Sequence, residues 1–294
     1  MLHPITFSFP EEKVIREIPV KTKVVSSLIP GKLDTYIYTN ESDYYNEYQQ
    51  SLFALTTKKA GWDCMRHYEI IANGCIPYFP DIEQCPPNTM ALLPKDLIKE
   101  GNLLYDAYKN TAIGDLSSSD IDNCKELITK LVAYLQDHLT TAKMAKYILN
   151  TTRDVKSILF LSGQSSPDYL RCITLHGFKS ILGSKCHDYP KIPHIYKSST
   201  INYQGLYGKG ITYTNLLDPD MRDDSLDNRL EEDIHNKKYD MIVYGSYHRG
   251  MPYYNIISRI YPASDIILLC GEDIHKCDYQ MWINRGHHVF VREL

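Results

Sequence analysis

The chain has 294 residues, of which 43% are hydrophobic and 23% are charged, and its formal net charge is −4. This composition is ordinary for a soluble globular protein, and the length suits two domains of common size. The negative balance argues against nucleic-acid binding through an overall basic field and leaves only a local basic cleft open.

The first half of the chain predicts short strands that alternate with helices. Met65, Tyr68 and Ile71 recur at helical spacing, and Gly74 suits the left-handed residue that ends a helix. Strands are expected at 35–39, 52–56 and 76–79. Helices are expected over 42–50, with Ser42 as the cap, over 63–73 and, as one or two helices, over 119–149.

The second half begins with a nearly continuous apolar run at 157–162, which is typical of a buried parallel strand. Further strands are expected at 241–244, 265–270 and 288–291, and helices at 167–182, around 226–234, at 252–260 and at 277–284. Such alternation predicts parallel sheets with right-handed crossovers. The fold class is therefore α/β with two Rossmann-like lobes, divided into 1–152 and 153–294.

Cysteine usage and the chain start indicate the cellular compartment. Eight cysteines contain no C-x-x-C pair, which predicts reduced thiols rather than a disulfide framework or a zinc site. The first residues lack the layout of a signal peptide, and no apolar run approaches the roughly 18 residues that indicate a membrane span. We therefore expect a cytoplasmic protein without a membrane span, located in the host cytoplasm if it is viral.

The most informative segment is LFALTTKKAGWDCMRHYEIIANGCIPYFPDIEQCPPNTM at 52–90. It holds an Arg-x-x-Glu pair, Arg66 and Glu69, and an Ala-Asn-Gly-Cys-Ile-Pro turn at 72–77. This segment resembles the donor-binding lobe of glycosyltransferases with the two-lobed GT-B fold, especially the exostosin-like enzymes of phage, viruses and bacteria. The resemblance implies two parallel sheets that face a cleft, a nucleotide-sugar such as a UDP- or GDP-sugar as co-substrate, and no metal or other cofactor.

Elementary chemistry supports a donor site in this segment. A diphosphate needs amide donors at a helix N-terminus and cationic side chains, and a carboxylate one turn along, Glu69, can accept from both ribose hydroxyls. Alternatively, Arg66 and Glu69 form a surface ion pair, and Trp62 is a core residue rather than a sugar-stacking one. The donor-binding candidates are Lys58, Lys59, Gly61, Trp62, Asp63, Arg66, Glu69 and Gly74.

The second half is similar to the acceptor-side lobe of the same enzymes, through YDMIVYGSYHRGMP, IILLCGED and HHVFVREL. In the family this lobe comes first, and a piece like FVREL leads into a piece like HPITFSFPEE. Here FVREL ends the chain and HPITFSFPEE lies near its start. The resemblance therefore implies a circular permutation, which is tolerated where the original termini are close together.

A catalytic base is expected in loops after the strands of the second half, because ligands gather at the carboxyl ends of parallel strands. Asp273 is the preferred candidate, and His248 and Asp168 are the others. Each has a structural alternative: Asp273 and Asp168 as helix-start acids, and His248 as a packed histidine. Asp218-Pro219-Asp220 matches a D-x-D metal motif but is expected to be a turn.

These observations predict a metal-independent glycosyltransferase whose acceptor is a glycan or a small molecule. A modified DNA base is a less favoured acceptor, because it would require a basic cleft and base flipping. The competing hypothesis is a catalytically inactive nucleotide or nucleotide-sugar binding module that acts as a sensor or partner subunit, since a fold alone does not imply activity.

Overall fold

The protein, a computed structural model that describes residues 1–273 and 277–294, contains a six-stranded and a three-stranded sheet. Every adjacent pair of strands is parallel. The larger sheet has the order β1 (Leu2–Pro4), β9 (His288–Val291), β8 (Ile266–Cys270), β7 (Met241–Tyr244), β5 (Ile158–Leu161), β6 (Cys186–Tyr189). The smaller has the order β2 (Lys23–Val25), β3 (Ser51–Leu55), β4 (Ile76–Tyr78). The predicted α/β, Rossmann-like class is confirmed.

Helices cover both faces of the larger sheet, which explains why its strands are apolar at nearly every position. Phe160 and Val243 pack on the face covered by α5 (Thr141–Thr151) and α6 (Tyr169–Leu182). Their neighbours Leu159 and Ile242 pack on the opposite face. The helices on that face are α7 (Leu230–His235), α8 (Tyr254–Ile260) and α9 (Tyr279–Asn284).

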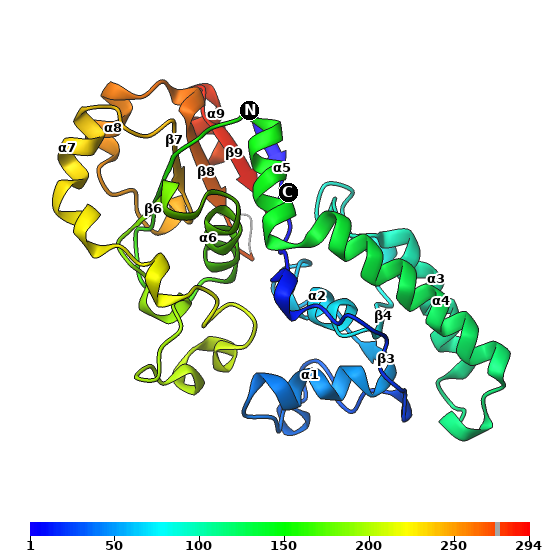
Figure 1. Ribbon diagram of the computed structural model, residues 1–294. Helices are drawn as coiled ribbons and strands as arrows, with labels where there is room; N and C mark the ends of the chain where they lie inside the picture. The colour runs from blue at the N-terminus through cyan, green and yellow to red at the C-terminus, as the bar shows by residue number, and fades with distance from the viewer. Residues whose placement is uncertain (274–276) are drawn as a thin grey trace.

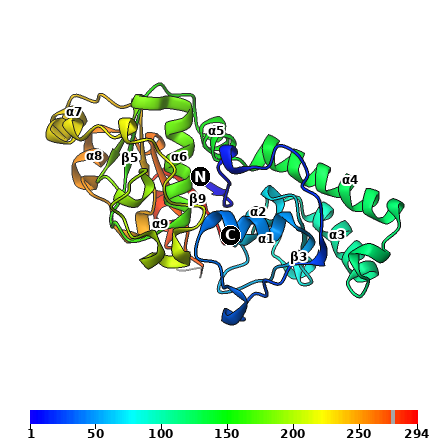
Figure 2. The same ribbon diagram turned by 60° about the horizontal axis from the view of Figure 1, so that its bottom comes forward.

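The smaller sheet lies in another part of the molecule, and α3 and α4 mark the end of the molecule opposite to α7 and α8 (Figures 1 and 2). Ser117 caps α4 in a capping box with Asp120. A π-helical turn at Leu135–Leu139 then separates α4 from α5. The helices of this half are α1 (Glu41–Gln49), α2 (Met65–Ala72), α3 (Lys95–Tyr108) and α4 (Ser118–Tyr134).

The strand order of the larger sheet places a topological switch beside β5. The chain moves from β5 to β6 on one side, and then returns to β7, β8 and β9 on the other side. In open parallel sheets, ligands bind at the carboxyl ends of the strands next to such a switch. The loops that follow β5 and β7 are therefore the natural place for polar groups that contact a ligand.

Several predicted elements are shifted or wrong. The strand expected at 35–39 does not form: a 3-10 turn covers Leu33–Thr35, and β2 pairs with β3 in its place. Asn40, rather than Ser42, caps α1 by accepting a hydrogen bond from the Asp43 amide. Four further elements, β1, β2, β6 and α3, were not predicted from the sequence. Gly74 does end α2 with a left-handed φ of 65°, as predicted.

The two chain ends lie at opposite ends of β9. The Met1 amino group donates to the His287 carbonyl, and β1 runs parallel to β9. The Leu294 carbonyl instead accepts a hydrogen bond from Thr89 at 2.6 Å. Because β1 and β9 are parallel, a segment that linked the end of β9 to the start of β1 would have to run back along the length of the sheet. The permuted lobe order stays a prediction.

The division at 152/153 also stays a prediction, although β1 belongs to the larger sheet. Within residues 1–273 and 277–294, no helix combines the length and apolarity that a bilayer span requires.

Candidate functional site

A cavity of about 480 Å³ lies between loops from both halves of the chain. This volume is in the range of pockets that hold small ligands. The first half contributes residues of the 31–38 loop, the loop between β3 and α2, and α2 itself. The second half contributes Tyr169 at the start of α6, the 206–211 loop, and Asp273 after β8. Five tyrosines line the cavity: Tyr36, Tyr38, Tyr44, Tyr169 and Tyr207.

The structure brings about half of the predicted site residues to this cavity. The residues that line it are Lys59, Gly61, Asp63, Arg66, Glu69 and Asp273. Lys58 instead lies over the ring of Trp62, with its ammonium 4.9 Å from the ring centroid. Gly74 is at the far end of α2, where an added Cβ would clash with Ile15. Asp168 and His248 belong to a neighbouring polar network, described below.

Arg66 is a buried cation that forms no ion pair with a carboxylate among the described residues. It is only 6% exposed, and its Nη1 donates to Thr56 Oγ1 at 3.5 Å. No ion pair to Arg66 occurs within the described residues, so the alternative of a surface pair with Glu69 is wrong. Because a buried charge without an ion-pair partner is costly, a guanidinium in a cavity wall favours binding of an anion there.

The first turn of α2 adds unpaired amides to the same wall. Cys64 and Met65 both line the cavity, and Cys64 is the residue before the helix. The first amides of a helix have no acceptor within the helix, and in the described chain no acceptor is recorded for these two. Together with Arg66, they form an anion-binding wall defined here as Cys64, Met65 and Arg66.

Two other amides of this region are not free, which corrects the expectation of an open anion site near residue 63. The Glu293 carboxylate accepts hydrogen bonds from the Trp62 amide at 3.0 Å and from the Asp63 amide at 2.9 Å. A Cβ added at Gly61 would lie 2.5 Å from Glu293 Oε1. Gly61 is therefore required by the chain's own carboxylate, and a bound phosphate is not needed to explain it.

Arg292 fixes this arrangement from the larger sheet. Its side chain is fully buried and donates to the Asp63 carbonyl, to Glu293 and to Asp273. Burial alone would lower the pKa of Arg292, but the carboxylates of Asp63, Glu293 and Asp273 raise it. The guanidinium therefore stays charged and holds the end of β9 against the loop before α2.

Asp63 is buried at the start of α2 and lines the cavity. Its carboxylate accepts hydrogen bonds from the Phe7 amide and from the Tyr68 hydroxyl, each at 2.8 Å. Burial raises the pKa of Asp63 to about 6, although Arg292 acts in the opposite direction. A carboxyl with a pKa this close to neutrality is suited to proton transfer.

Glu69 lies one turn further along α2 and is also buried. One oxygen accepts from the Tyr44 hydroxyl at 2.8 Å, and the other accepts from the Thr212 hydroxyl. Burial raises the pKa of Glu69, while the two hydroxyl donors oppose this effect. Glu69 therefore joins α2 to α1 and to the second half, and each oxygen retains capacity for one further hydrogen bond.

The 206–211 loop closes the cavity from the side of the larger sheet. Lys209 donates to the backbone carbonyls of Tyr36, at 3.3 Å, and Tyr38. Lys209 has a left-handed φ of 55° between two glycines that are also left-handed. This backbone conformation turns the Lys209 ammonium toward the 31–38 loop. The segment wrongly expected to be a strand is thus one rim of the cavity.

The remaining catalytic candidates form a polar network at the topological switch. Asp168 caps α6 through the Arg171 amide and accepts from Ser246 after β7. His248 Nε2 lies 2.7 Å from Glu272, and burial lowers the pKa of His248 against the opposing effect of that carboxylate. Arg249 lies 3.5 Å from Asp168. Asp168 thus caps a helix, which is the structural role considered for it as an alternative to a catalytic base.

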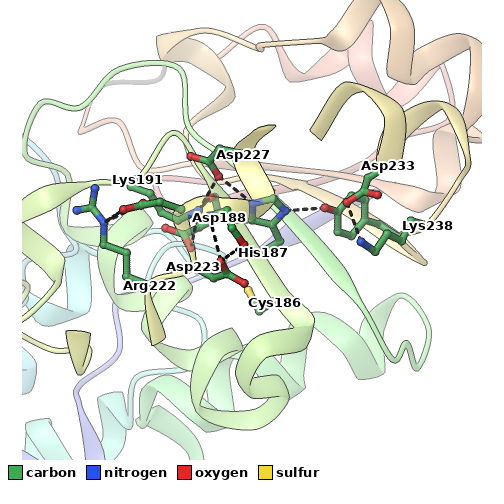
Figure 3. Close-up of polar contacts among 12 residues, drawn as sticks. Cys186, His187, Asp188, Lys191, Arg222, Asp223, Asp227, Asp233 and Lys238 are labelled. Carbon is green, nitrogen blue, oxygen red and sulfur yellow. Dashed lines mark hydrogen bonds and ion pairs between the residues drawn. The ribbon is translucent and has the colours of Figure 1, made fainter. Parts of the chain in front are cut away.

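A second buried charge cluster lies at the β6 edge of the larger sheet (Figure 3). Asp188 pairs with Lys179 at 2.8 Å, and both are almost fully buried. Lys191 and His187 both contact Asp227, at 2.8 and 3.0 Å. These charges are paired with one another and none of the residues lines the cavity. The arrangement fits stabilisation of the sheet edge rather than ligand binding.

Asp63 gives the site a testable pH dependence. Its pKa is about 6 in the folded protein against 3.8 ordinarily, so the folded state holds this proton more tightly than the unfolded chain. The resulting stability is present below pH 3.8 and is lost as the pH rises through 6. Relative to the Asp63→Asn variant, the free energy of unfolding of the wild-type protein is expected to fall by about 3 kcal/mol as the pH rises through this range. Urea unfolding of both proteins below pH 3.8 and above pH 6 measures this fall. A difference in unfolding free energy between the two proteins that stays constant with pH would contradict the raised pKa of Asp63.

Sequence reasoning missed Arg292, Glu293 and Lys209. Their contacts join positions that are distant in the chain, such as Trp62 and Glu293, and no local pattern indicates them. The frequency of tyrosine, 24 residues against 7 phenylalanines, was the one available signal for the aromatic wall.

Comparison of the chain with family models, with curated proteins and with solved structures finds no match.

Proposed function

We propose that the protein is a glycosyltransferase that transfers a sugar from a nucleotide-sugar, such as a UDP- or GDP-sugar, to a hydroxyl acceptor. The observation that carries this proposal is the buried guanidinium of Arg66, which has no ion pair within residues 1–273 and 277–294, in the wall of a cavity between the two halves of the chain. A diphosphate supplies the negative charge that this guanidinium lacks. The donor segment at 52–90 and its resemblance to GT-B enzymes give the same assignment.

The donor would bind along the first half of the chain. The amides of Cys64 and Met65 and the Arg66 side chain would bind the diphosphate, with Lys59 at the cavity edge. Charge neutralisation by these groups removes the need for a metal at the leaving group. The cavity tyrosines offer flat, amphipathic surfaces for a base or a sugar ring, and Glu69 can accept from a ribose hydroxyl.

The acceptor would approach from the second half. Asp273 is the one acid of the predicted catalytic set that lines the cavity, and its side chain is 56% exposed. In an inverting reaction it would take the proton of the acceptor hydroxyl. Asp63 and Glu69 are the other carboxylates at the cavity, whereas Asp168 and His248 would act through the neighbouring polar network. The acceptor is a glycan or small molecule, with a modified DNA base less favoured. The proposal includes a circularly permuted chain, in which the acceptor-side lobe follows the donor-binding lobe.

A thermal-shift screen of nucleoside diphosphates and their sugars tests the proposal. A ligand at 100 times its dissociation constant should stabilise the protein by about 2.7 kcal/mol. Slow hydrolysis of the bound nucleotide-sugar without acceptor would support an enzyme. Tight binding without any turnover would point to an inactive nucleotide-binding module, and no shift with any compound would reject the donor site.

A further inference from the structure

Three side chains with metal-binding atoms meet behind the cavity: His248, Cys270 and Cys277. Each offers one ligand atom, and these atoms lie within 4.8 Å of one another. Cys270 is the last residue of β8, and His248 follows β7, the neighbouring strand. Carboxyl ends of adjacent parallel strands share one edge of a sheet, which brings the imidazole to the sulfur. None of the three residues lines the cavity.

Cys277 is brought to the same point by the chain that follows β8. The Cα atoms of Cys270 and Cys277 are 6.6 Å apart, and the structure pairs the two residues as a disulfide. The expectation that all eight cysteines are free thiols is therefore wrong for this pair in the structure. The other six cysteines are free. When reduced, the pair places two thiols beside the His248 ring.

The orientation of His248 indicates a ligand on its free nitrogen. Its Nε2 lies 2.7 Å from Glu272 and 3.3 Å from Arg249 Nε, while its Nδ1 is buried and has no hydrogen-bond partner among the described residues. A buried polar atom without a partner requires an explanation. Histidine ligands of metals characteristically direct one nitrogen at the ion and the other at a carboxylate, which fixes the ring. Glu272 is that carboxylate here, and Nδ1 is the nitrogen that remains.

The donor set selects the ion. Thiolate and imidazole ligands together favour Zn²⁺, and three protein ligands with one open position are a known zinc arrangement. Two thiolates also cancel the charge of a divalent ion, so the ion with these thiolates and a neutral imidazole carries no net charge. Binding would release two thiol protons and requires no oxidant or reductant once the cysteines are reduced.

We propose that the reduced protein binds one Zn²⁺ through Cys270, Cys277 and His248, with Glu272 holding the imidazole. The ion would fasten the ends of β7 and β8 to the chain before α9. It would thereby hold the segment at 271–273 that presents Asp273 to the cavity. This site is separate from the diphosphate wall and does not depend on the proposed transferase activity.

The test uses the full-length protein after reduction, with Zn²⁺ and then Co²⁺ as probes. We expect one equivalent of either ion to bind, and the cobalt form to show the near-ultraviolet charge-transfer absorption of a cobalt–thiolate bond. Cys277→Ser should weaken zinc binding at least tenfold, and Glu272→Gln by about 10–100-fold. Cys85→Ser removes a half-buried free cysteine elsewhere and is the matched control, with unchanged affinity.

Two results would overturn the zinc site. One is a reduced, folded protein that binds neither ion. The other is a cobalt complex without the thiolate absorption, or one that Cys277→Ser leaves unchanged. Because the cobalt spectrum is recorded on the unaltered chain, it decides thiolate ligation even if a cysteine variant does not fold. Loss of binding in the Cys85→Ser control would likewise reject the assignment.

Discussion

Replacing Arg66 with alanine is expected to abolish the thermal shift produced by a nucleoside diphosphate or its sugar. The guanidinium is buried in the cavity wall and has no carboxylate partner within the described residues. A phosphate would supply that partner, and truncating one side of a buried charge pair costs about 2–5 kcal/mol of binding. Affinity should fall by a factor of roughly 30 to several thousand. Calorimetric titration of the folded variant measures the change directly.

Two further variants make this result specific. Arg66→Lys keeps the charge but loses the planar two-pronged donor, so it should bind with intermediate affinity. Lys58→Ala removes a nearby cation that lies over Trp62 and does not line the cavity, so it should bind as the wild type does. If Arg66→Ala binds normally while Lys58→Ala does not, the diphosphate lies elsewhere and the donor site assigned here is wrong.

Local patterns predicted the frame that positions the site. The strands at Met241–Tyr244 and His288–Val291 lie where their apolar runs placed them. The α2 helix also lies near its predicted position, because its apolar spacing and Gly74 act over a few residues. These signals are intrinsic to a short segment, so tertiary contacts reinforce them rather than replace them.

The sequence-based predictions that were wrong concern segments whose structure depends on contacts between distant parts of the chain. Tyr36 and Tyr38 alternate with Ile37 as a strand would, but they form a cavity rim whose carbonyls accept from Lys209 in the other half. Glu293 meets the Trp62 amide across 231 positions. The sequence marked the region before α2 as an anion site, and the structure divides it between an internal carboxylate and the wall at Arg66. No local pattern specifies that division.

The second large effect is expected at Arg292, where methionine should destabilise the protein by about 3–5 kcal/mol. The side chain is fully buried and donates to Glu293, to Asp273 and to the Asp63 carbonyl. Its removal would leave the largely enclosed Glu293 carboxylate without its cation, and would detach β9 from the loop before α2. Urea unfolding at neutral pH measures the loss of stability. Arg285→Met, which removes a cation stacked 5.0 Å from the Trp282 ring, should cost only about 0.5–1 kcal/mol.

Arg66 and Arg292 are both buried, but they should respond differently to replacement by methionine. Arg292 has its negative partners inside the protein, whereas Arg66 has none among the described residues. Without ligand, Arg66→Met should therefore leave stability unchanged or raise it, because it removes a buried charge that forms no ion pair among the described residues. Arg292→Met should lower stability whether or not ligand is present. Equal destabilisation by both variants would mean that Arg66 is a structural residue like Arg292, and that the cavity is not built to receive an anion.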